Sequence, residues 1–433
     1  MAAYSSFLAK AHLFPLVGGA LYVTFILSLM YLKDFQAQNL FLHKIVFPFN
    51  PQFDEPERYG LAPHKTRNLR LKSDDGIQIG AWHVVPDIHL RQIVQKFDDP
   101  APSDSAYDAA LKAYPTVIYL HGNAANRAAP FRIASYNQFT NRLAANVVAI
   151  DYRGFGDSEG DPTEEGLILD AKAAFDWVVA RKMAQGMSEE EGRNDILIVG
   201  QSLGTGVAAG VTQRLVERGT PPNAVYLMAP YISIAHLLTS YQLAGFVPIF
   251  APVRLIPYHQ DLIPYYLNAR FENFNALPRL IRASGLDPEG QVSADHTAKS
   301  EVRPGHPHII ISSATDDDVI PFRHGETLFE SLLRVHLGLA TLPGSRGTKA
   351  QNEREWEREY ENHVHVRKAV SRAGTWAKTY TFWTDAKLEP KQEGPSVSLI
   401  RTPFGGHNGV ADGIIDVVGE LSGINFNKAR TQS

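Results

Sequence analysis

The stretch Ile196-Leu197-Ile198-Val199-Gly200-Gln201-Ser202-Leu203-Gly204 decides how this chain folds. Its first four residues form an apolar run that predicts a buried strand, and the Ala-rich residues 205–215 predict a helix. A serine at such a junction, with glycines two positions to either side, is typical of a sharp turn, because larger side chains would clash across it. The turn would lift the Ser202 hydroxyl out of the sheet and place a helix N-terminus behind it. We therefore predict that Ser202 is a nucleophile.

Two further candidates follow later strands. The apolar run 308–313 predicts a buried parallel strand, and the carboxylates of Asp316 and Asp317 come directly after it. A carboxylate at this edge of a sheet can hold an imidazole in the tautomer that a serine nucleophile needs. The last predicted strand, 397–400, is followed by a Gly-rich turn that contains His407. We predict that His407 takes the serine proton and later returns it to the leaving group.

The nucleophile, the acid and the base thus occur in the chain order of an α/β-hydrolase fold, each at a strand end. Strands and helices alternate after about residue 116, which predicts a mostly parallel sheet with flanking helices. We favour Asp317 as the acid, because these hydrolases commonly place it four residues ahead of a proline, here Pro321, and Asp316 is the alternative. The amides of Asn123 and Leu203 are the candidate oxyanion hole, each donor contributing about 3–4 kcal/mol in the transition state.

The residues Asp151-Tyr152-Arg153-Gly154-Phe155-Gly156-Asp157-Ser158-Glu159-Gly160, together with 200–208, resemble the twelfth branch of the abhydrolase-domain-containing lysophospholipase and monoacylglycerol lipase group. The resemblance is dense over residues 119–230 and implies a membrane-anchored lipase of single-chain glycerolipids in the endoplasmic reticulum. Gln201 departs from the group, which usually has a histidine there, and the segment between the acid and base loops is unusually long. From its own composition, the loop 151–160 predicts structural support braced by an internal ion pair.

The second informative segment is apolar and lies near the N-terminus. Residues 13–32 carry no charge and match the length needed to cross a bilayer, so we predict a membrane anchor within 1–36. A cleaved signal peptide and a buried soluble helix are the alternatives, but no small-x-small cleavage site is present. Lys10 on one flank and Lys33 on the other leave the orientation open.

Residues 37–433 are predicted to form one elaborated catalytic domain with two insertions. The first, about 230–304, contains the uncharged, proline-broken stretch 241–253, which could cover the active site, dip into the membrane interface or simply pack as a core. The second, about 337–395, contains the charged, helix-prone run 353–361, for which a solvated helix face is the default interpretation. That insertion could gate the site, bind a partner or decorate the surface.

Composition narrows the classes of function. The formal net charge of −4 over 433 residues argues against a nucleic-acid partner. The absence of cysteine excludes thiol catalysis and Cys-based zinc sites, and no H-E-x-x-H spacing occurs, so we expect neither a metal nor a cofactor.

We therefore expect a membrane-anchored serine hydrolase that cleaves carboxylic esters of lipids through Ser202, His407 and Asp317. A peptidase, an acyl-protein thioesterase or a general esterase could use the same three residues. A non-catalytic membrane scaffold with a relict fold would be expected to have lost one of them, and the sequence retains all three.

Overall fold

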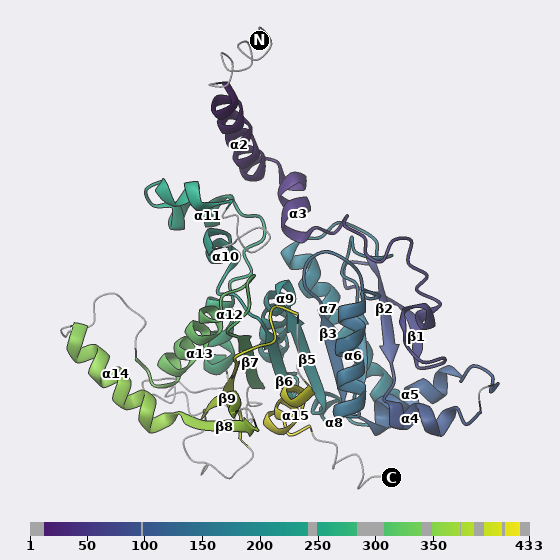
Figure 1. Ribbon diagram of the computed structural model, residues 1–433. Coiled ribbons are helices and arrows are strands. Elements are labelled where there is room, and N and C mark those ends of the chain that lie inside the picture. The colour runs from purple at the N-terminus through teal and green to yellow at the C-terminus, as the bar shows by residue number, and fades with distance from the viewer. Residues whose placement is uncertain are drawn as a thin grey trace, which may run out of the picture.

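The computed structural model describes residues 13–96, 98–240, 249–283, 307–339, 349–372, 374–384, 394–408 and 412–424. These residues form one ten-stranded sheet in the order β1-β2-β4-β3-β5-β6-β7-β10-β9-β8 (Figure 1). The strands are β1 (Thr66–Lys72), β2 (Gln78–Val84), β3 (Thr116–Leu120), β4 (Asn146–Ile150), β5 (Ile196–Gln201), β6 (Ala224–Met228), β7 (His308–Ala314), β8 (His365–Ser371), β9 (Gly374–Trp383) and β10 (Ser396–Thr402).

Helices flank both faces of this sheet and also project from it (Figure 1). They are α2 (Leu13–Tyr31), α3 (Lys33–Phe41), η1 (Pro56–Tyr59), α4 (Asp87–Ile93), α5 (Asp104–Ala113), α6 (Pro130–Arg142), α7 (Glu164–Ala184), α8 (Glu189–Arg193), α9 (Leu203–Glu217), α10 (Ile234–Ser240), η2 (Ala251–Leu255), α11 (His259–Tyr266), α12 (Asn273–Ala283), α13 (Arg323–His336), α14 (Lys349–His363) and α15 (Asp412–Leu421).

The centre of the sheet is parallel from β4 through β3, β5, β6 and β7 to β10. Strands β1 and β2 form an antiparallel hairpin, and Gly76 takes the left-handed conformation (φ 92°) in its turn. The α/β-hydrolase fold predicted from the order of strands, helices and site residues is therefore confirmed. Parallel strands end at the same edge, so the loops after β3, β5, β7 and β10 share one side of the molecule.

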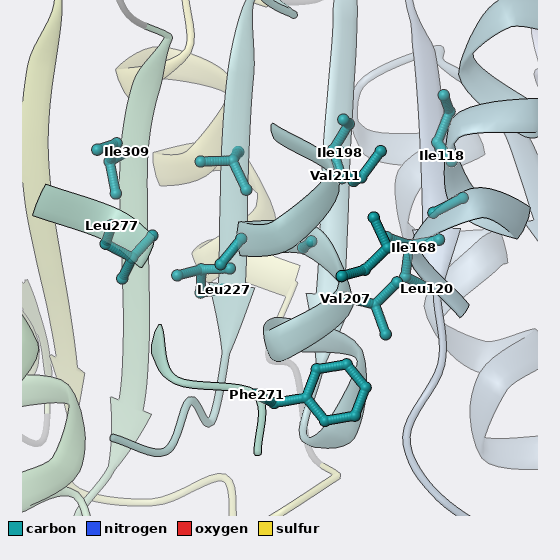
Figure 2. Close-up of a cluster of buried hydrophobic side chains, with 14 of the residues drawn as sticks. Ile118, Leu120, Ile168, Ile198, Val207, Val211, Leu227, Phe271, Leu277 and Ile309 are labelled. Atoms are coloured by element: carbon teal, nitrogen blue, oxygen red, sulfur yellow. The ribbon is translucent and has the colours of Figure 1, made fainter. Parts of the chain in front are cut away.

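The core lies on both faces of the sheet because successive strand residues point to opposite sides. On β5, Ile198 packs in a cluster with Val207 of α9, and the preceding Leu197 packs in a second cluster with Tyr136 of α6. Figure 2 shows the first cluster, in which α9 lies across the strands and brings its valines to the strand isoleucines. Burial of each such aliphatic side chain contributes roughly 1.5–3 kcal/mol, so α9 is fixed firmly behind the residue that precedes it, Ser202.

The second insertion contributes to the sheet itself. Residues 353–361 belong to α14, and the chain then forms the hairpin of β8 and β9, with β9 antiparallel to β10. The sequence analysis anticipated a charged helix but no strands here. Strand β8 is exposed along most of its length, so it lacks the alternation of buried and exposed residues from which a strand is recognised. Residues 340–348 and 385–393 lie outside the described part of the chain.

Ion pairs brace the loop 151–160 from outside, not from within as predicted. The guanidinium of Arg127, fully buried, lies 2.6 Å from Asp151 and 2.7 Å from Asp157. Arg153 pairs instead with Asp170 of α7 at 2.8 Å. The prediction of an internal pair is therefore wrong, because the arginine and the aspartates of this loop find their partners on neighbouring elements.

The N-terminal helix α2 coincides with the predicted apolar stretch. Residues Phe14–Tyr31 are long and apolar enough to cross a membrane, and none of that span is buried. Figure 1 shows α2 projecting from the hydrolase body, with α3 between them. The helix therefore offers a lipid-compatible surface, which is exposed over residues 14–21 and nowhere buried in the span.

One prediction concerns stability. Burial, together with the adjacent Arg67 charge, lowers the pKa of His83 to about 3. An unfolded histidine has a pKa of about 6.5, so between these values the unfolded chain binds a proton that the folded chain does not. We expect the free energy of unfolding to fall as pH drops through this window, by at most about 1.4 kcal/mol per pH unit for this residue. Urea unfolding in detergent should show a shallower pH dependence for His83→Gln. The exposed residue His365, replaced by Gln, is the control; an unchanged slope in His83→Gln would contradict the assignment.

Candidate active site

Ser202 occupies a strained turn between β5 and α9. Its backbone has φ 52° and ψ −118°, a conformation that a non-glycine residue adopts only when its surroundings impose it. A Cβ atom on Gly204 would overlap the Leu120 carbonyl, and one on Gly200 would overlap the Gly204 carbonyl. The Ser202 amide donates to the Met228 carbonyl at 3.0 Å. The two glycines thus let β5, β3 and α9 approach closely enough to force the turn.

The loop after β3 lies against this turn. A Cβ atom on Gly122 would come within 3.3 Å of the Ser202 Cβ, so the loop and the serine are in direct contact. Among the described residues, the amides of Asn123 and Leu203 donate no hydrogen bond. Leu203 opens α9, where the first N–H groups have no partner within the helix. The N–H groups of both predicted oxyanion donors therefore have no acceptor among the described residues.

A segment that the sequence analysis did not single out holds this loop in place. The next two loop residues, Ala124 and Ala125, take left-handed conformations (φ 56° and 54°). Their amides donate to the carbonyls of Phe41 and Ile45, both at 2.9 Å. These two hydrogen bonds attach the loop to the end of α3 and the residues after it, while the Asn123 amide is left unpaired among the described residues.

Arg132 of α6 supports the same loop through hydrogen bonds to its carbonyls. The sequence analysis did not identify this residue either. Its side chain is 1% exposed, and its terminal nitrogen Nη2 donates to the carbonyls of Gly122 (3.1 Å) and Ala124 (2.7 Å). Carbonyls drawn toward the guanidinium restrict how the peptide groups between them can turn. No motif in the sequence marks Arg132, because it reaches the loop from the first turns of α6.

The structure brings His407 and Asp317 together. The histidine Nδ1 lies 3.1 Å from Asp317 Oδ2, with side chains that are 14% and 2% exposed. The other carboxylate oxygen of Asp317 accepts from the amides of Val319 (2.9 Å) and Ile320 (2.8 Å). These two bonds fix the carboxylate so that one oxygen faces the imidazole. An Nδ1–H···carboxylate bond leaves Nε2 free to accept a proton.

Asp316, the alternative acid, has a different role in the geometry. Its carboxylate oxygens accept from the amides of Gly405 (3.2 Å) and Gly406 (2.8 Å). Asp316 therefore holds the turn that carries His407, and Asp317 contacts the imidazole itself.

Gln201 connects the serine turn to the histidine loop. Its Oε1 accepts from the Tyr119 hydroxyl at 2.6 Å, and its Nε2 donates to Asn408 Oδ1 at 2.9 Å. Among the described residues, no hydrogen bond joins the Ser202 hydroxyl to His407. The amide of Gln201 is thus the observed link between the two loops, at the position where the sequence departs from the group it resembles.

His121, next to the serine turn, is a different kind of histidine. It is 1% exposed, its Nδ1 donates to the Gly122 carbonyl at 2.6 Å, and its ring packs 4.4 Å from that of Tyr152. Burial, with the charge of Arg132 nearby, lowers the pKa of His121 to about 4. The ring is therefore neutral at physiological pH and acts as a packed support for the loop.

A cavity of about 450 Å³ opens between α7, α9 and α12, away from these residues. Its wall includes Glu164, Arg214, Arg270 and Arg279 and none of the predicted site residues. A charged lining is unsuited to an acyl chain, so the cavity does not enter the mechanism. Within the described ranges, no group of three His, Asp or Glu side chains is arranged to hold a metal ion.

The profile of the alpha/beta hydrolase family matches residues 117–346, which include β3, the serine turn and the acid loop. The chain belongs to this family.

Proteins of similar sequence indicate which group within this family the chain resembles. The lysophosphatidylserine lipase ABHD12 of Xenopus tropicalis is 33% identical over 295 residues, which cover 68% of this chain and 64% of that protein. The Bos taurus protein of the same name is 31% identical over 319 residues, or 73% of this chain and 68% of that one. They confirm the resemblance to the lysophospholipase-type group. Among solved structures, an alpha-beta hydrolase from Vibrio vulnificus matches with 17% identity and a TM-score of 0.45 over 70% of this chain and 82% of its own.

Variants of Asp316 and Asp317, two of the three acids in the loop after β7, should differ sharply in activity. We expect Asp317→Asn to lower kcat by about 10⁴-fold, because an amide would favour the wrong imidazole tautomer. Asp316→Asn should lower it by less than about tenfold, since it perturbs only the turn. Hydrolysis of a soluble p-nitrophenyl ester by the two variants decides between them. A greater loss in Asp316→Asn would reverse the assignment.

The Gln201 link makes a separate prediction. Gln201→Ala and Asn408→Ala should each lower kcat by about five- to tenfold, the equivalent of one neutral hydrogen bond, because the histidine loop loses its tie to the serine turn. Since both changes break the same bond, the double variant should be little worse than the poorer single variant. Losses that multiply in the double variant would show that the two side chains act independently.

Proposed function

We propose that this protein is a membrane-anchored serine hydrolase that cleaves the carboxylic ester of single-chain glycerolipids, as a lysophospholipase or monoacylglycerol lipase does. The observation that carries the proposal is the bond of 3.1 Å between His407 and Asp317 at the sheet edge where Ser202 occupies its strained turn. An imidazole oriented by a buried carboxylate, at the same sheet edge as a half-buried serine turn, is the arrangement from which acyl transfer proceeds.

The proposed reaction has two halves. Ser202 Oγ attacks the ester carbon while His407 Nε2 accepts its proton, and the imidazolium is stabilised by Asp317. The amides of Asn123 and Leu203 donate to the oxyanion, and the proton passes from His407 to the departing lyso-lipid or glycerol oxygen. Water, deprotonated by the same histidine, then hydrolyses the acyl-enzyme and releases the fatty acid.

Two features support a lipid as substrate. The relatives are named for a lysophosphatidylserine lipase activity. The apolar helix α2 would hold the enzyme where single-chain lipids reside. We further propose that residues 13–32 cross the endoplasmic reticulum membrane once, that 37–433 form a single catalytic domain, and that its insertion at about 230–304 acts as the cap through which lipid reaches Ser202.

A substrate panel tests this proposal. Detergent-solubilised protein should release fatty acid from lysophospholipids and monoacylglycerols. The variant Ser202→Ala should release fatty acid at least about 10⁴-fold more slowly, because no nucleophile remains. Ser105→Ala, at an exposed position of α5, is the matched control and should retain full activity. Circular dichroism checks that both variants fold.

The outcomes separate the alternatives. Serine-dependent cleavage of only a peptide amide, a thioester or short p-nitrophenyl esters would move the function to a peptidase, a thioesterase or a general esterase. Fatty acid release that survives Ser202→Ala would refute the proposed nucleophile.

A further inference from the structure

Large apolar side chains are exposed on the cap segment that follows α10. Leu255 is 85% exposed, Tyr258 80% and Tyr265 77%, with Ile256 and Leu262 about half exposed at 47% and 45%. These five residues, here termed the cap rim, lie on and between η2 and α11. Side chains of this kind are normally buried, and a contiguous group of them on the surface marks a site of interaction.

The cap rim is continuous with the proposed membrane anchor. The Tyr31 ring of α2 packs edge-to-face on that of Tyr266, the last residue of α11, at 5.8 Å. Gln36 of α3 donates to the Tyr266 carbonyl at 2.8 Å, and its Oε1 accepts from the Asn268 amide at 2.7 Å. Figure 1 shows α11 beside α2, raised above the hydrolase body on the same side. A membrane that surrounds α2 would therefore meet the cap rim.

A contact farther along α2 indicates how deep the cap reaches. The Tyr22 hydroxyl donates to the Ile249 carbonyl at 3.0 Å. Tyr22 lies nine residues before Tyr31, which is about 14 Å along the helix axis. A hydroxyl and a carbonyl that satisfy each other are suited to hydrocarbon, where neither could bond to water. The cap segment thus contacts α2 at Tyr22 as well as at Tyr31, its last residue.

The chemistry of the cap rim suits the boundary between headgroups and acyl chains. Tyrosines with an apolar ring and a polar hydroxyl are enriched at this depth, and leucine and isoleucine extend below it. The segment is far too short to cross a bilayer, so it would lie in one leaflet.

The cap rim is also connected to the serine turn. Beyond α11, Asn273 at the start of α12 is buried, and its Nδ2 donates to the Tyr231 carbonyl at 2.8 Å and to Thr205 Oγ1 at 3.3 Å. Thr205 itself donates to the Ser202 carbonyl at 2.7 Å. A short, bonded path therefore runs from the cap to the residue that carries the nucleophile.

We propose that the cap rim inserts into the leaflet beside α2, as a second membrane contact that seats the cap in the lipid from which substrate is drawn. This inference rests on the proposed anchoring by α2 and adds a lipid-bound position for the cap. The occupant of the surface is the bilayer itself, because the patch adjoins the helix that a bilayer would surround.

The absence of cysteine allows a direct test in the full chain. Leu255→Cys and Tyr258→Cys, each labelled with an environment-sensitive nitrobenzoxadiazole, would be reconstituted into phosphatidylcholine and phosphatidylserine vesicles. We expect blue-shifted emission, quenching by nitroxide-bearing lipid and loss of quenching by aqueous iodide. Val23→Cys on α2 reports the anchor. Met183→Cys, 47% exposed near the end of α7, is the aqueous control.

The labels separate two kinds of failure. If Val23 is quenched by lipid and the cap labels behave like Met183, the inference about the cap is wrong and the anchor stands. If Val23 also behaves like Met183, the proposed anchoring fails as well. Lipid quenching of the cap labels supports the inference.

A functional readout completes the test. Leu255→Asp and Tyr258→Asp should reduce hydrolysis of lipid presented in vesicles and leave turnover of a soluble p-nitrophenyl ester unchanged. Met183→Asp should alter neither. Equal loss on both substrates would overturn the inference, because it would indicate a damaged cap rather than a lost membrane contact.

Discussion

The close approach of β5, α9 and β3 around Ser202 is the constraint on which the site depends. Gly200 and Gly204 are the residues that permit it, since any side chain there would overlap a backbone carbonyl. The strain at Ser202 is offset by the aliphatic packing of α9 on the sheet, which is worth far more than the roughly 1–3 kcal/mol that one strained residue costs. The packing of the core therefore contributes more to holding the turn than its few hydrogen bonds do.

Around this turn, each loop is positioned by residues distant in sequence. The carbonyls of Phe41 and Ile45 clamp the loop that carries Asn123. Gln201 connects the serine turn to Asn408. After β7, Asp316 bonds to the turn that carries His407, and Asp317 contacts His407 itself. Since the clamp follows directly from α2 and α3, the proposed anchor and the proposed oxyanion loop belong to one continuous piece of structure.

The proposed membrane attachment and the proposed chemistry are consequently linked through contacts between α2, the segment 249–283 and the serine turn. The cap packs along α2 through Tyr22 and Tyr31 and reaches the serine turn through Asn273. A bilayer that holds α2 and the cap rim would hold the entrance to the site at a fixed depth. The β8–β9 hairpin widens the sheet by two strands next to β10, and β10 is the strand that leads to His407.

The sequence by itself determined the fold and the identity of the candidate residues. Local patterns sufficed, because buried parallel strands are apolar runs, the serine turn requires glycines at fixed spacing, and chain order distinguishes this fold from others. Only the tertiary structure decided that Asp317 rather than Asp316 faces His407, that Gln201 bonds to Asn408, and that Arg127 braces the loop after β4. It also revealed the β8–β9 hairpin, whose exposed strand has no periodic signal. These features depend on pairs of residues far apart along the chain, and no local pattern records which distant partner a side chain will meet.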